Sequence, residues 1–172
     1  MIGKTMTAPR HPRKLRSLTL AVYLLAGAVG LNLFAPPLRA GTTEQIVIDR
    51  SSGLAIGGFD PVAYFVDATG IKGKSEFEYN FAGAVWQFRN AGNRAAFIAD
   101  PEVYMPRYGG YDPSAIMRGV AIPGDSRRWA IFGERLYLFA TSEARKLFAA
   151  DPERIIAAAE RSWPSVRRAL SP

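Results

Sequence analysis

The stretch from Tyr104 to Ala115 reads Tyr-Met-Pro-Arg-Tyr-Gly-Gly-Tyr-Asp-Pro-Ser-Ala. Its two glycines, two prolines and three tyrosines are too irregular a mixture for a long helix or a regular strand, and too aromatic for an exposed linker. Gly109 and Gly110 would let the backbone take positive φ angles or approach another group closely. The stretch therefore predicts either a binding loop or a tightly packed turn beneath a small sheet.

The basic charge lies almost entirely at the N-terminal end. The formal net charge of the 172 residues is +7, but residues 1–40 hold six basic and no acidic residues, whereas the rest holds 16 basic and 15 acidic residues. Because the part from residue 41 onward is close to neutral, we expect no nucleic-acid partner. The length, with 48% hydrophobic and 22% charged residues, predicts one globular domain.

Residues 1–40 have the three parts of a secretory signal peptide. A basic leader ends at Arg16, an apolar run extends from Leu18 to Ala35, and a short polar exit ends at Ala40. We expect cleavage after Ala40 and a periplasmic or secreted protein. An uncleaved anchor is the alternative, because the apolar run approaches the ~18 residues that span a membrane, and the membrane would then be touched only through this segment. A start at Met6 instead of Met1 is also open.

The expected mature chain lacks the two side chains that most often carry catalysis or bind zinc. It has no cysteine, and its one histidine, His11, lies in the leader. Thiol nucleophiles, imidazole acid–base chemistry and the usual zinc sites are therefore excluded after residue 40.

Two hairpin-then-helix segments dominate the rest of the chain. Aromatic residues alternate with polar ones at 77–81 and the chain returns at 85–88, and a second pair of strands is expected at 129–132 and 135–139. Helices follow each hairpin, several of them preceded by Asp-Pro pairs. These features predict an α+β fold, a small antiparallel sheet built from two β-hairpins with several short helices packed on it. The two segments look superficially alike, but we recognise no internal repeat.

Several motifs follow one another in a distinctive order. They are Gly-Phe-Asp-Pro-Val-Ala-Tyr-Phe (58–65), Trp-Gln-Phe (86–88), Asp-Pro-Glu-Val-Tyr (100–104), Pro-Arg-Tyr-Gly-Gly-Tyr (106–111), Leu-Tyr-Leu (136–138) and Trp-Pro (163–164). In this order they resemble the small exported YHS-domain proteins of bacteria. We therefore expect a lead-in segment at residues 41–52, a YHS-like domain at 53–164 and a basic tail at 165–172.

The resemblance implies a module of the heavy-metal-associated YHS/TRASH-like superfamily, in which cysteines are the presumed metal ligands. In the family pattern Cys-Ala follows the Gly-Gly-Tyr, whereas Asp112-Pro113-Ser114-Ala115 follows it here. The ligand candidate is missing. We therefore expect a degenerate metal site and no cofactor.

Three residues are weak metal candidates. Asp112 could be a hard oxygen ligand for a divalent ion, but capping a helical turn is the favoured interpretation, as for the other Asp-Pro pairs. Met105 and Met117 could together hold copper(I), but methionine more often fills a core.

The tyrosines have two interpretations. They would line an apolar pocket in which Arg107 attracts an anionic ligand, or they would fill the core, which is the favoured interpretation for a small domain without disulfides. The ligand-binding candidates are Asp60, Tyr64, Arg107, Tyr108, Gly109, Gly110, Tyr111 and Asp112.

The expected function is that of a non-catalytic accessory module for a small-molecule or protein partner. Weak binding of copper or another divalent ion is one alternative. A carboxylate- or tyrosine-based enzyme is another, for example with Asp60 and Asp125 as an acid–base pair, although no motif fixes their separation. A structural envelope protein is the last. We assign no catalytic residue.

Overall fold

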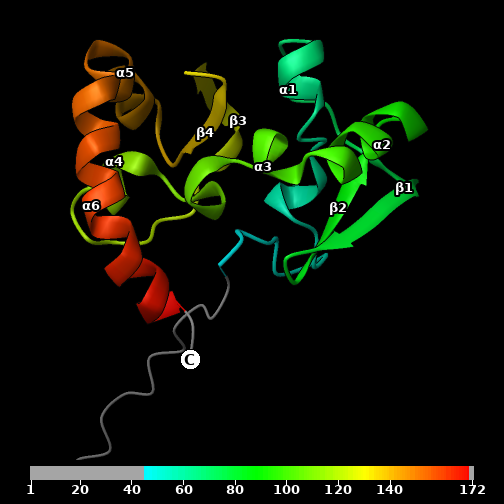
Figure 1. Cartoon of the computed structure of the whole chain (residues 1–172), viewed down its shortest axis with the longest axis horizontal. Helices are drawn as coiled ribbons and strands as arrows, with labels where there is room; N and C mark the ends of the chain where they lie inside the picture. The colour runs from blue at the N-terminus through cyan, green and yellow to red at the C-terminus, as the bar shows by residue number, and fades with distance from the viewer. Residues whose placement is uncertain (1–44, 171–172) are drawn as a thin grey trace, which may run out of the picture. The chain divides into compact units, whose positions relative to one another are not determined.

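The computed structural model describes residues 45–170 and confirms the α+β class (Figure 1). The first elements are the 3₁₀ turn η1 (Ile56–Gly58), α1 (Ala63–Val66), β1 (Lys74–Phe81), β2 (Ala84–Phe88), α2 (Ala91–Ala99) and α3 (Pro101–Tyr104). They are followed by the 3₁₀ turn η2 (Arg107–Gly110), α4 (Pro113–Ile116), β3 (Asp125–Phe132), β4 (Arg135–Phe139), α5 (Ser142–Ala150) and α6 (Pro152–Leu170). The expected leader of residues 1–40 lies outside the described residues.

Both expected hairpins are present. β1 pairs with β2 and β3 pairs with β4, each pair antiparallel. The two pairs form separate two-stranded sheets, so the expectation that both hairpins join in one small sheet is wrong. Asn90 and Thr141 cap the helices that follow, since their side chains accept hydrogen bonds from the backbone N–H groups of Asn93 and Ala144. The local signals in the sequence therefore locate both hairpins and these two helix starts, although β1 and β3 begin three and four residues earlier than expected.

The elements repeat in the same order, so the chain is an internal duplication. We call residues 56–104 the first copy and residues 108–170 the second copy. Each contains a 3₁₀ turn, a one-turn helix, a hairpin, a nine-residue helix and a final helix that begins at Asp-Pro. The expectation of no repeat is wrong.

The backbone of the two copies agrees in detail. Three consecutive residues have positive φ in each 3₁₀ turn, namely Ile56, Gly57 and Gly58 in the first copy and Tyr108, Gly109 and Gly110 in the second. The N–H of Asp60 donates to the carbonyl of Ile71 (2.8 Å), and that of Asp112 donates to the carbonyl of Ile122 (2.9 Å). Both hairpins also break register near the start of their first strand. The repeat is hard to recognise in the sequence because only turn glycines, Asp-Pro pairs and scattered aromatic residues are the same.

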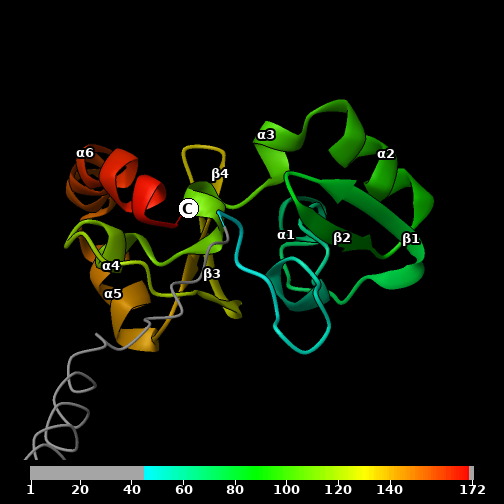
Figure 2. The same ribbon diagram turned by 90° about the horizontal axis from the view of Figure 1, so that it is seen from below.

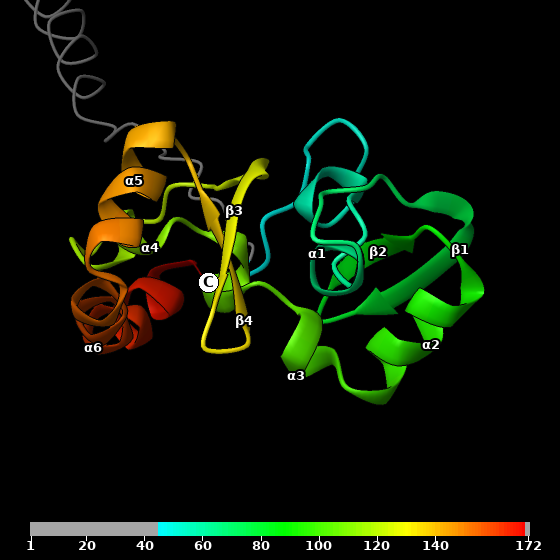
Figure 3. The ribbon, with the colours of Figure 1, turned by 90° about the horizontal axis from the view of Figure 1, so that it is seen from above.

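The second hairpin lies between two hydrophobic cores. Leu136 and Leu138 of β4 pack in a core with Trp86 of the first copy, whereas Tyr137 and Phe139 pack in a core whose buried residues all belong to the second copy. This follows from the alternation of side chains along a strand. Figures 2 and 3 show β3 and β4 between the helices of the second copy and the elements of the first. One strand therefore serves both cores.

The folded unit extends beyond the expected domain boundaries at both ends. In the expected lead-in, Ile46 is buried, and Val47 donates to the carbonyl of Gly109 (2.8 Å) and accepts from the N–H of Ile56 (2.8 Å). In the expected basic tail, α6 continues through Pro164 to Leu170. Val166 and Leu170 hold these last turns in place, because they lie one helical turn apart and are both buried in the second core. Within residues 45–170, no helix is long and apolar enough to cross a membrane.

Candidate ligand-binding site

The stretch from Tyr104 to Ala115 connects the two copies. It ends α3, forms η2 and then begins α4 at the capping residue Asp112. Eight of its twelve residues therefore lie in helical turns rather than in a free loop, and each candidate residue within it has a defined structural environment.

Asp60 and Asp112 occupy equivalent buried positions in the two copies. Asp112 accepts hydrogen bonds from the N–H of Ser114 (2.7 Å) through Oδ1 and from the N–H of Ala140 (2.8 Å) through Oδ2. Asp60 accepts from the N–H groups of Val62, Ala63 and Arg89 and from the side-chain amide of Asn93. Each carboxylate thus ties the start of a one-turn helix to the end of the hairpin. The capping interpretation of Asp112 is confirmed.

Gly109 is needed for a close backbone approach. Its φ is +63°, and a Cβ atom there would lie 1.8 Å from the carbonyl oxygen of Gln45. The equivalent Gly57 has φ +64°, but a Cβ there would meet nothing within 4 Å. Gly110 is buried, with φ +91°. The expectation that these glycines allow positive φ or a close approach is confirmed.

Two of the candidate tyrosines belong to the cores. Tyr64 is 1% exposed, donates a hydrogen bond from its hydroxyl to the carbonyl of Ser126 (2.7 Å), and packs edge-on against Trp129 at 5.2 Å between ring centroids. Burial raises the pKa of Tyr64, so its hydroxyl keeps its proton. Tyr111 is 2% exposed and belongs to the second core. The core interpretation is therefore correct for both residues.

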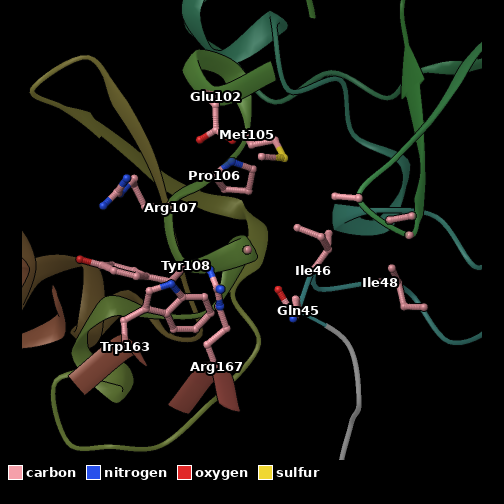
Figure 4. A pocket seen from close by; sticks show the side chains of 14 residues that line it. Gln45, Ile46, Ile48, Glu102, Met105, Pro106, Arg107, Tyr108, Trp163 and Arg167 are labelled. Carbon is pink, nitrogen blue, oxygen red and sulfur yellow. The ribbon is translucent and has the colours of Figure 1, made fainter. Parts of the chain in front are cut away.

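A pocket of about 700 Å³ opens where the two copies meet (Figure 4). It is formed by the segment before the first copy, the turn of the first hairpin, the connection between the copies, and α6. The lining residues are Gln45, Ile46, Ile48, Ala82, Gly83, Ala84, Glu102, Met105, Pro106, Arg107, Tyr108, Gly109, Trp163 and Arg167. Of the ligand-binding candidates, only Arg107, Tyr108 and Gly109 are brought together here; Asp60, Tyr64, Gly110, Tyr111 and Asp112 do not line it.

One wall of the pocket is aromatic. Tyr108 is 4% exposed, and its ring packs edge-on against that of Trp163 at 5.5 Å between centroids. Its hydroxyl donates to Oε1 of Glu160 (3.2 Å). Burial and then the charge of Glu160 raise the pKa of Tyr108, which keeps the phenol neutral.

Arg107 is held by the protein itself. Its guanidinium group forms an ion pair with Glu160 and lies 5.6 Å from the centre of the Tyr108 ring. Because this positive charge already has a partner, Arg107 is not the free cation that the sequence suggested.

Arg167 and Trp163 are the site residues that the sequence analysis missed. Figure 4 shows the Arg167 side chain pointing from α6 into the pocket, and it follows Trp163 by one helical turn. It makes no ion pair with any residue of the described range 45–170. The four-residue spacing of Trp163 and Arg167 is a usable signal. Arg167 lies in the expected basic tail, and its side chain is exposed as that expectation implies.

The methionines do not form a shared metal site. Met105 packs against the first core and lines the pocket, whereas Met117 packs against the second core. Asp125, the other half of the suggested acid–base pair, faces Arg128 in an ion pair of 2.9 Å. Among residues 45–170, no group of three or more His, Cys, Asp or Glu residues is placed to hold a metal ion.

The chain matches no known protein-family model, no curated protein and no solved structure. Its resemblance to YHS-domain proteins stays a prediction that these comparisons do not test.

Proposed function

We propose that the chain is a non-catalytic binding module that holds a small organic ligand in the pocket between its two copies. The pocket itself carries this proposal. Its volume of about 700 Å³ falls within the range of small-molecule sites, which occur preferentially where two structural units meet. It also combines an apolar wall with a few polar groups, as such sites do.

The pocket is supported from behind by fixed backbone. Val47 and Gly109 are joined by a backbone hydrogen bond, and the close contact between Gly109 and Gln45 leaves no room for a side chain between these segments. A site that is formed before the ligand arrives loses less conformational entropy on binding.

The absence of catalysis is proposed because the candidate reactive groups are already engaged. The buried carboxylates of Asp60 and Asp112 accept backbone N–H groups. The hydroxyls of Tyr64 and Tyr108 donate to Ser126 and Glu160. A carboxylate- or tyrosine-based enzyme would have to break these bonds to use the groups.

We extend the proposal to the family and the compartment that the sequence suggests. The protein would be an exported YHS-like domain in which Asp112 stands where the family pattern has cysteine. Since Asp112 ties Ser114 to Ala140, the metal-site loop of the family would here have become a structural turn. No metal cofactor is part of the proposal.

Native mass spectrometry of the full chain, purified from its own cells, tests the proposal. We expect an organic mass to co-purify with the wild-type protein and to be lost when Gln45→Trp fills the pocket. Arg50→Trp is the matched control, since Arg50 is exposed and lies outside the pocket. If the Gln45→Trp protein still co-purifies with the organic mass, the assignment of the ligand to this pocket is contradicted. Stoichiometric binding of copper(I), copper(II) or zinc at micromolar concentration would contradict the absence of a metal.

A further inference from the structure

We propose that the ligand is an amphiphile with one anionic head group, bound by Arg167, and an alkyl body that lies along the apolar wall. This inference rests on the proposed function, because it concerns the same pocket. It adds the chemical class of the ligand and the residue that selects it.

The balance of charges around the pocket favours a single negative charge. Arg107 and Arg167 line it, and the guanidinium group of Arg135 donates to the backbone carbonyl of Glu102 at its edge (2.5 Å). Two carboxylates lie among these three cations: Glu160 pairs with Arg107, and Glu102 lines the pocket without an ion pair to any described residue. One positive charge is left without a counterpart, and a monoanion would neutralise it.

Arg167 is the group that carries this charge. Glu160 already binds Arg107, whereas Arg167 makes no ion pair within the described part of the chain. Its planar guanidinium group can donate two parallel hydrogen bonds to a carboxylate, or to a phosphate of similar geometry. Arg167 is exposed, so a ligand that enters the pocket from solvent can reach its guanidinium group.

The opposite wall is suited to an alkyl chain. Ile46, Ile48 and Met105 line it, and the small residues of the first hairpin turn also line the pocket. Ile48 and Met105 are only partly buried by the protein and pack on its first core. A flexible hydrocarbon would remove this apolar surface from water without requiring polar partners.

The pocket also distinguishes the two copies. α3 of the first copy ends at Tyr104 after four residues, whereas the equivalent α6 of the second copy has 19 residues. The additional turns supply both Trp163 and Arg167. Trp163 and Arg167 therefore belong to turns of α6 that α3, its equivalent in the first copy, does not have.

Calorimetric titration of the full chain with decanoate, decanol and acetate tests the inference. We expect decanoate to bind at least tenfold more tightly than decanol, because only the acid can pair with Arg167, and acetate not to bind measurably, because it lacks the alkyl body. Arg167→Gln is expected to weaken decanoate binding by tenfold or more and to leave decanol binding unchanged.

Arg168→Gln is the matched control. Arg168 is the exposed neighbour of Arg167 on α6, hydrogen-bonded only to Ser165 within the described residues, and its removal changes the net charge by the same amount. It is expected to leave decanoate binding unchanged, and circular dichroism checks that both variants keep α6. An equal loss with Arg168→Gln would overturn the assignment to Arg167.

The remaining outcomes separate the inference from the proposed function. Equal binding of decanoate and decanol, or no binding of either while an organic mass is lost from Gln45→Trp, overturns the anionic amphiphile but keeps the pocket as a binding site. An anionic head on an alkyl chain also occurs in membrane lipids. If the protein binds phosphatidylglycerol vesicles but not free decanoate, the inference that the ligand is a free amphiphile is overturned. If no probe binds and no mass co-purifies, both proposals fail.

Discussion

The two copies have the same backbone framework but differ in how far the second strand of each hairpin is buried. In both, a buried aspartate ties a one-turn helix to the end of a hairpin, as Asp60 and Asp112 show. In the first copy only one face of β2 is buried, whereas residues 136–139 of β4 are buried on both faces. The repeated positions therefore build the unit, and the longer α6 of the second copy adds Trp163 and Arg167 to the pocket.

The aspartates are expected to differ in their contribution to stability. Asp60 accepts four hydrogen bonds and Asp112 accepts two from described residues. Replacement by alanine leaves these buried donors without a partner, so Asp60→Ala should lower the free energy of unfolding by about 4 kcal/mol and Asp112→Ala by about 2 kcal/mol. Urea denaturation measures both. A larger loss for Asp112→Ala would contradict the equivalence of the two positions.

The glycines of the two 3₁₀ turns provide the next comparison. Gly57→Ala should cost about 1 kcal/mol, because its only penalty is a side chain at positive φ. Gly109→Ala should cost about 3 kcal/mol, because the new Cβ also displaces the segment that contains Gln45. Hydrogen exchange at the amide of Val47, which donates to Gly109, should accelerate only in Gly109→Ala. Equal losses of stability in Gly57→Ala and Gly109→Ala would show that the segment containing Gln45 is not packed against Gly109.

The smallest effect is expected at Ser114, the equivalent of Val62 in the first copy. The Ser114 hydroxyl is buried and has no hydrogen-bond partner among the described residues. Its removal in Ser114→Ala should raise the free energy of unfolding by about 1 kcal/mol, measured in urea. The reciprocal change Val62→Ser should lower it. A loss of stability in Ser114→Ala would mean that the hydroxyl has a partner after all.

The sequence predicts the features that depend on near neighbours. The alternation at Phe77, Tyr79 and Phe81 defines the first hairpin, and the Asp-Pro pair at Asp112 defines a cap, because both signals act within a few residues. The pocket depends on segments distant in the chain. Ile46 and Arg167 are far apart in the sequence, and no local pattern predicts that they line the same pocket. They do so because α6 and the first described residues pack together in the folded protein.

The central claim is that the pocket between the copies binds an anionic amphiphile, and the two methionines after the leader test it directly. Met105 lines the pocket, and Met117 packs against the second core. The full chain is labelled with ¹³C in the methionine methyl groups, the signals are assigned with Met105→Leu and Met117→Leu, and decanoate is added. We predict that the Met105 signal shifts while the Met117 signal stays in place. A Met105 signal that does not move at saturating decanoate would contradict the account.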